Sequence, residues 1–285
     1  MKERAQRLAL FSAIEGGTPF WTREINERGA QTVYDRIMNK SYDPIKYASA
    51  IEKVAAFESA PAFQDIEKHG GTFIIPGDSQ WPLRLDELEA PPIGLIVKGN
   101  VDSLSHPSLA IVGTRNPTPY GTRIAGDFAA GFVDREWDIV SGGAYGIDSA
   151  AHRGALVAEG RTIAVIASGI DLQYPAGNTR LFEEICENGA IVSEVMPGVP
   201  AMPHRFLTRN RLIAALSQAT LVVEAAFRSG SLRTARDAAE LMRPVMAIPG
   251  PINSPSSEGC HRLIGERAAE LVTSVADAIE LISAL

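Results

Sequence analysis

Residues 137–148 read WDIVSGGAYGID, a short apolar run that passes directly into a glycine-rich turn. The residues that follow, 149–159, have a pattern typical of a helix. A strand that is buried on both faces forms a continuous apolar run rather than an alternating one, as this run does. We therefore predict a buried strand, a tight turn and a helix in succession.

The same succession recurs along the chain from Leu109 onward. Alternation of strands and helices implies right-handed crossovers between parallel strands. We therefore predict an α/β fold with a doubly wound, mostly parallel, Rossmann-like sheet. The further predicted strands of this region are 109–112, 162–166, 190–192, 221–223 and 245–248, and the further predicted helices are 123–135, 179–187 and 234–242.

The chain before this region has a different pattern. Apolar residues recur at helical spacing in 30–38 and 48–57, among many charged side chains. Two short apolar runs, 72–75 and 93–98, are bounded by proline and glycine and favour strands. We expect a small helical N-terminal domain over residues 1–68, followed by the Rossmann-like domain over residues 69–285.

The composition excludes several classes of protein. The formal net charge of −7 argues against a protein that coats nucleic acid by bulk attraction, so any nucleic-acid site must be a local patch. No apolar run is long enough to span a membrane, and the first ten residues lack a signal peptide, so we expect a cytoplasmic location. Cys186 and Cys260 lie far apart and the five histidines are scattered, so we expect no metal site.

Several predicted strand-to-helix turns are rich in glycine, serine and threonine, namely 113–121, 141–148 and 229–231. In doubly wound sheets ligands bind at the carboxyl ends of the strands, and helix N-termini there favour phosphate. The steric need for glycine in tight turns explains the same composition, so spacing alone leaves a phosphate ligand open. The Gly-x-Gly-x-x-Gly pattern is absent after residue 112, so we expect neither an NAD enzyme nor a cofactor.

A basic run follows at Arg205, Arg209 and Arg211, with Phe206 inside it. Arginine forks bind phosphate groups, and an aromatic ring among them offers a surface on which a base stacks. The alternative is a solvated helix face with Phe206 in the core. The residues alone leave both interpretations open.

Asp148 and His152 stand four residues apart at the start of a predicted helix. Such a pair suits general acid–base catalysis. An aspartate in the first helical turn also complements the helix dipole without any catalytic role, and this second interpretation is favoured.

Taken together, these motifs resemble the DprA/Smf family of DNA-processing proteins. The likeness covers about residues 70–272 and is densest at 141–152, which read SGGAYGIDSAAH. Further matching motifs are GTR at 113–115, YG at 120–121, GIDLQYP at 169–175, RNRLIAALS at 209–217, SGSL at 229–232, IPG at 248–250 and GCHRLI at 259–264.

The resemblance implies a protein that binds single-stranded DNA during natural transformation, forms a homodimer and helps to load the recombinase RecA onto the strand, without catalytic turnover. It also shifts the interpretation of the basic run toward DNA binding. The implied nucleic-acid and phosphate-binding residues are Gly113, Thr114, Arg115, Tyr120, Ser141, Gly142, Gly143, Ala144, Gly146, Asp148, Arg205, Phe206, Arg209, Asn210, Arg211, Ser229, Gly230 and Ser231.

The sequence departs from the family pattern in two places. Arg233 stands where the family more often has an apolar residue, and it would either contact a phosphate or lie exposed. Many relatives carry a winged-helix domain after the Rossmann-like domain, whereas this sequence ends soon after it, so we expect no C-terminal winged helix.

Two alternative functions stay open. The first is an enzyme similar to the LOG-type nucleotide phosphoribohydrolases, in which Thr234 and Asp237, or Glu224, would supply the catalytic groups. Their Pro-Gly-Gly-x-Gly-Thr-x-x-Glu motif is missing from this sequence. The second is a nucleotide sensor or scaffold with no role on DNA.

Overall fold

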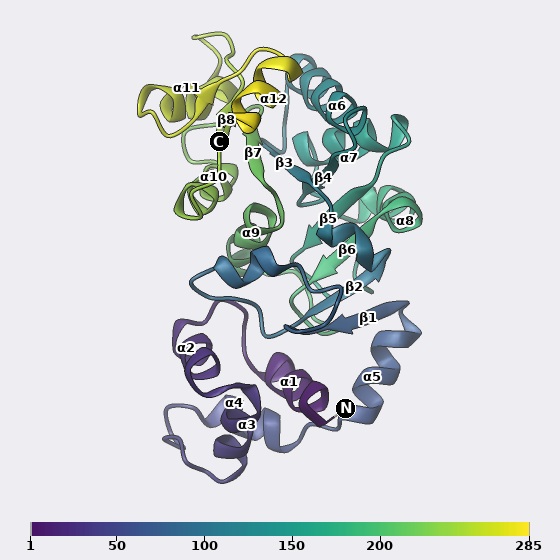
Figure 1. Ribbon diagram of the computed structural model, residues 1–285, viewed down its shortest axis with the longest axis vertical. Coiled ribbons are helices and arrows are strands. Elements are labelled where there is room, and N and C mark those ends of the chain that lie inside the picture. Colours follow the sequence, from purple (N-terminus) through teal and green to yellow (C-terminus); the bar gives the residue numbers. More distant parts are fainter. Residues whose placement is uncertain (1, 285) are drawn as a thin grey trace.

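A mixed sheet runs through most of the molecule in the computed structural model, which describes residues 2–284 (Figure 1). Its nine strands lie in the order β1-β2-β6-β5-β4-β3-β7-β8-β9 among the described residues. The strands are β1 (Gly71–Ile74), β2 (Leu95–Gly99), β3 (Ser108–Val112), β4 (Asp138–Ser141), β5 (Thr162–Ile166), β6 (Ala190–Ser193), β7 (Ala219–Val222), β8 (Val245–Ala247) and β9 (Glu270–Leu271).

The strand order creates a crevice where ligands bind in this class of sheet. From β3 the chain steps through β4, β5 and β6 in one direction and then returns to β7, on the other side of β3. All pairings from β6 to β9 are parallel, and β1 and β2 add an antiparallel edge. The predicted doubly wound, mostly parallel sheet is confirmed, and its switch point lies between β3 and β7.

Helices cover both faces of the sheet, as Figure 1 shows. One apolar cluster packs α6, α7 and α12 against β3, β4, β7 and β8, and another packs α9, α10 and α11 on the opposite face. The side chains of β3 are buried throughout, which explains its unalternated apolar sequence. The helices of this region are α6 (Pro119–Val133), α7 (Ile147–Val157), α8 (Thr179–Asn188), α9 (Pro203–Leu216), α10 (Ser231–Glu240), α11 (Glu258–Gly265) and α12 (Val275–Ser283).

Helices alone precede the first strand in residues 2–70, in agreement with the predicted helical region. They gather at one end of the molecule beside β1 (Figure 1). Their apolar cluster continues into the sheet through Phe73 and Ile96. The division into two domains at residue 68 remains a prediction. These helices are α1 (Lys2–Ala13), α2 (Pro19–Arg28), α3 (Ala30–Met38), α4 (Ala48–Ala55) and α5 (Ser59–Lys68).

Three helices begin earlier than the sequence pattern predicts, and one of them is α7, which starts at Ile147 rather than at residue 149. α6 starts at Pro119 rather than at residue 123, because the Thr118 hydroxyl accepts a hydrogen bond from the Gly121 N–H and proline suits the first helical position. α10 starts at Ser231 rather than at residue 234. No helix between residues 2 and 284 combines the length and hydropathy needed to cross a bilayer.

Candidate nucleic-acid interface

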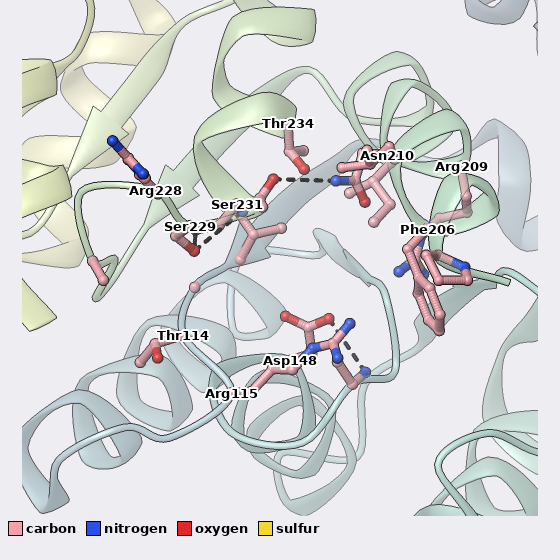
Figure 2. Close-up of a pocket in the computed structure, with 18 of the residues that line it drawn as sticks. Thr114, Arg115, Asp148, Phe206, Arg209, Asn210, Arg228, Ser229, Ser231 and Thr234 are labelled. Atoms are coloured by element: carbon pink, nitrogen blue, oxygen red, sulfur yellow. Dashed lines mark hydrogen bonds between the residues drawn. The ribbon is translucent and has the colours of Figure 1, made fainter. Parts of the chain in front are cut away.

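A pocket of about 720 Å³ opens at the carboxyl ends of β3, β4 and β7, next to the switch point of the sheet (Figure 2). Helix α9 forms a further wall. Eleven of the eighteen residues predicted for the DNA site line it, and seven do not. Those that line it are Gly113, Thr114, Arg115, Ala144, Asp148, Phe206, Arg209, Asn210, Ser229, Gly230 and Ser231. Those that lie outside the lining are Tyr120, Ser141, Gly142, Gly143, Gly146, Arg205 and Arg211.

The turn after β3 presents Arg115 at the pocket mouth. A hydrogen bond of 3.1 Å from the Ile147 N–H to the Thr114 carbonyl fixes this turn against the start of α7. Gly146, at φ +84°, allows the approach, because a β-carbon there would lie 2.3 Å from the Thr114 oxygen. The exposed Arg115 guanidinium then stacks 5.1 Å from the centre of the Phe206 ring.

Glu224 holds the same turn from the other side. Its carboxylate, buried at the end of β7, accepts hydrogen bonds from the Thr118 N–H (2.9 Å) and the Thr118 hydroxyl (2.7 Å). Its backbone carbonyl accepts a third, from the Thr114 N–H at 2.7 Å. Glu224 is therefore a structural group that shapes the turn, and its carboxylate does not face the pocket.

The basic run lies on α9. The alternative interpretation of this run as a solvated helix face is wrong. Arg209 is only 6% exposed, and its Nη1 donates to the carbonyls of Gly142 (2.7 Å) and Val165. Burial lowers the pKa of the Arg209 guanidinium to about 10, which still leaves it charged at neutral pH. Arg209 thus brings a fixed positive charge to the pocket wall and ties α9 to the ends of β4 and β5.

The two neighbouring arginines point elsewhere. Arg211 is buried and binds Glu194, with 2.7 Å between Nη2 and Oε2. Arg205 binds Glu15 from the helical region, with 3.1 Å between Nε and Oε2. Arg211, two residues after Arg209, projects from another side of α9, whereas Arg205 lies one turn before Arg209 and is held by Glu15. Only Arg209 of the three lines the pocket.

Phe206 lies half-buried on the pocket wall rather than in the core. Arg115 stacks on its ring, and the ring of Tyr174 approaches with 5.5 Å between centroids. Tyr174 and the exposed Arg228 also line the pocket but are absent from the predicted site. Tyr174 belongs to the GIDLQYP motif, and Arg228 directly precedes the SGS motif. These two motifs in the sequence could have indicated both residues.

The start of α10 forms the remaining wall. Ser229 and Ser231 share a hydrogen bond of 2.7 Å between their hydroxyls, and Asn210 of α9 donates to the Gly230 carbonyl at 3.2 Å (Figure 2). The N–H groups of residues 231–233 already donate to Ser229 and Gly230, so the attraction for an anion comes from the positive end of the helix dipole. Together with the nearby arginines, this wall is suited to bind a phosphate group.

The structure separates the two residues of the suggested acid–base pair. His152 is fully buried and hydrogen-bonds Thr162 rather than Asp148, with 2.6 Å between Nδ1 and Oγ1. Burial lowers the pKa of His152 to about 3, which keeps it neutral. The interpretation of Asp148 and His152 as an acid–base pair is therefore wrong. Asp237 forms an ion pair with Arg233, with 2.7 Å between Oδ1 and Nε. Of the two places predicted for Arg233, the structure shows the exposed one, and the pocket lining does not include this side chain.

The comparisons with known proteins agree with the motifs. Residues 72–283 match the family model described as DNA recombination-mediator protein A. The DNA processing protein DprA of Streptococcus pneumoniae is 40% identical over 229 residues, which cover 80% of each chain. A DprA relative from Mycobacterium tuberculosis is 44% identical over 237 residues, 78% of this chain, which spans only 61% of that relative.

Solved structures give the same result. The crystal structure of Streptococcus pneumoniae DprA superposes with a TM-score of 0.85 and 34% identity, covering 97% of both chains. A structure that describes the single-stranded DNA binding mode of Helicobacter pylori DNA processing protein A superposes with a TM-score of 0.68 and 31% identity, covering 75% of this chain and 97% of that one. The chain therefore belongs to the DNA recombination-mediator protein A family, the DprA/Smf proteins.

Proposed function

We propose that this protein binds single-stranded DNA in the pocket between β3, β4, β7 and α9. We further propose that it acts in the cytoplasm as a homodimer, without catalytic turnover, and helps to load a RecA-type recombinase onto the strand. Its family supports this role, as does the DNA binding mode described for its Helicobacter pylori relative.

The observation that carries the proposal is the combination of charges and an aromatic ring in one pocket. Arg115, Arg209 and Arg228 join the N-terminus of α10 around one pocket, while Phe206 offers a ring at the same wall. The bases of a duplex are stacked inside the helix, whereas those of a single strand are free to stack on such a ring. The pocket therefore favours single strands over duplexes.

The decisive experiment is fluorescence anisotropy with a labelled oligothymidylate, repeated over a salt series with a matched duplex as control. We expect binding that favours the single strand and weakens as salt rises, because arginine–phosphate contacts release counterions. With a few phosphate contacts, the slope of log K against log salt should be about −2 to −3. Absence of binding at low salt would contradict the proposal.

The remaining parts of the proposal need separate measurements. Light scattering coupled to gel filtration reports the mass of the protein in solution and tests the homodimer. The rate at which RecA filaments assemble on the same oligonucleotide, with and without this protein, tests recombinase loading. Recovery of the oligonucleotide intact after long incubation tests the lack of catalysis.

A further inference from the structure

A single carboxylate stands among the cationic groups of the pocket. Asp148, near the start of α7, is 7% exposed and lines the pocket with Arg115 and Arg209. Figure 2 shows its carboxylate directed into the open space that Arg115, Ser229 and Ser231 surround. A negative charge at this place repels phosphate, so phosphate binding does not explain its position.

The hydrogen bonds of Asp148 leave one of its oxygens available. Both backbone donors, the N–H groups of Gly142 (3.2 Å) and Ala144 (3.3 Å), reach the same oxygen, Oδ2. The Ser141 hydroxyl has its proton engaged with the Ile111 carbonyl at 2.6 Å. The charge of Arg209 favours the ionised form of Asp148, but Asp148 is absent from the ion pairs within 4 Å found across residues 2–284. Oδ1 is therefore a hydrogen-bond acceptor that faces the pocket.

A group that occupies this space beside Oδ1 must bring a hydrogen-bond donor. Phosphate and deoxyribose backbone of a DNA strand carry no N–H or O–H between the ends, so only the base edges supply donors. We propose that Asp148 accepts a hydrogen bond from the edge of one base, the N3–H of thymine or an amino proton of another base, while the adjoining phosphate binds the cationic wall. This inference rests on the proposed binding of single-stranded DNA.

If Asp148 had a purely structural role, then removing its charge would be expected to change the affinity for DNA in the opposite direction. If Asp148 only fixes the turn 142–144 and offsets the charge of Arg209, then its negative charge opposes the DNA backbone. Neutralising it would then leave the affinity unchanged or raise it. If Asp148 instead accepts a hydrogen bond from a base, then neutralising it must lower the affinity for DNA.

The test uses Asp148→Asn with labelled oligothymidylate. The asparagine carbonyl accepts the two backbone N–H groups, so its NH₂ group replaces Oδ1 and turns the acceptor into a donor. We expect affinity for oligothymidylate to fall about 10-fold, in line with the loss of a hydrogen bond to a charged group, while the salt dependence stays the same. Thermal unfolding of the variant checks that it is folded.

A second arm changes the DNA instead of the protein. An oligomer of N3-methylthymidine lacks the N3–H, and we expect the wild-type protein to bind it about 10-fold more weakly than oligothymidylate. Asp148→Asn should bind the two oligomers alike, whereas a mere steric clash of the methyl group would persist in the variant.

The possible failures are distinct. Equal or tighter binding of oligothymidylate by Asp148→Asn, or equal binding of both oligomers by the wild-type protein, would overturn the role of Asp148. Failure of the wild-type protein to bind any single strand would instead overturn the proposed function.

Discussion

Arg115 is the residue on which the pocket's affinity for DNA depends most directly. It is exposed, it has no carboxylate partner among the described residues, and it stacks on Phe206. We expect Arg115→Ala to weaken oligothymidylate binding about 10-fold and to reduce the salt slope by about one, because one phosphate contact is lost. Anisotropy over a salt series measures both quantities.

A matched control is available at Arg180 on α8. That side chain is 91% exposed and pairs with Glu184 away from the pocket. Arg180→Ala removes the same charge as Arg115→Ala but from a site outside the pocket, so it should leave the affinity almost unchanged. An equal loss in both variants would mean that net charge, and not the pocket, attracts the strand.

His152 makes folding sensitive to mild acid. Its pKa is about 3 in the folded protein and about 6.5 when unfolded, so below pH 6.5 the unfolded state takes up a proton that the folded state does not. The stability due to a neutral His152 is therefore present above pH 6.5 and falls by about 1.4 kcal/mol per pH unit toward pH 3.

Denaturant titrations of wild type and His152→Asn at several pH values measure this effect. The unfolding free energy of the wild-type protein should decline relative to that of the variant as pH falls from about 6.5. Subtracting the variant removes the contributions of buried carboxylates such as Asp148, whose raised pKa acts with the opposite sign. A constant difference between the two proteins would show that His152 charges in the folded state.

At the scale of elements, the turn between β3 and α6 depends on β7. Glu224 at the end of β7 holds the turn through Thr118 and Thr114, and the turn carries Arg115. We expect Glu224→Ala to weaken oligothymidylate binding about 10-fold, because Arg115 loses its fixed position. Glu224→Gln, which keeps one acceptor for Thr118, should lose less.

A double-mutant cycle distinguishes positioning from general damage. If Glu224 acts through Arg115, then adding Glu224→Ala to Arg115→Ala should change the affinity little further. Additive losses in the anisotropy measurements would instead indicate that Glu224 supports the pocket as a whole.

At the scale of the whole molecule, the helical region and the sheet share one apolar cluster. Phe11 of α1 packs edge-to-face on Phe73 of β1 at 5.2 Å, and Arg4 pairs with Asp78 at 2.6 Å. Because the contact surface is apolar and continuous, we expect both parts to unfold in a single transition rather than as separate units.

Single-tryptophan variants test this cooperativity. A Trp81→Phe/Trp137→Phe variant reports on Trp21 in the helical region, and a Trp21→Phe/Trp81→Phe variant reports on Trp137 beside β4. In each variant the fluorescence and circular dichroism transitions in urea should coincide. Earlier loss of the Trp21 signal would show that the helices unfold independently, as two separate domains do.

The sequence by itself determined the sheet and the position of the pocket. Continuous apolar runs and glycine-rich turns are local signals, because a strand buried on both faces and a tight turn impose their composition within a few residues. The carboxyl ends of parallel strands meet at one edge, so Arg115 and Ser231 could be assigned to one site without coordinates.

Only the tertiary structure decided which polar side chains face that site. Arg205, Arg209 and Arg211 look alike in the sequence, yet their partners come from residues 15, 142 and 194, far away along the chain. For Asp148 the turn that occupies one carboxylate oxygen is local, but the pocket walls around it come from residues 206–210 and 229–231. Hydrogen-bond partners of this kind depend on long-range packing, which no local pattern in the sequence encodes.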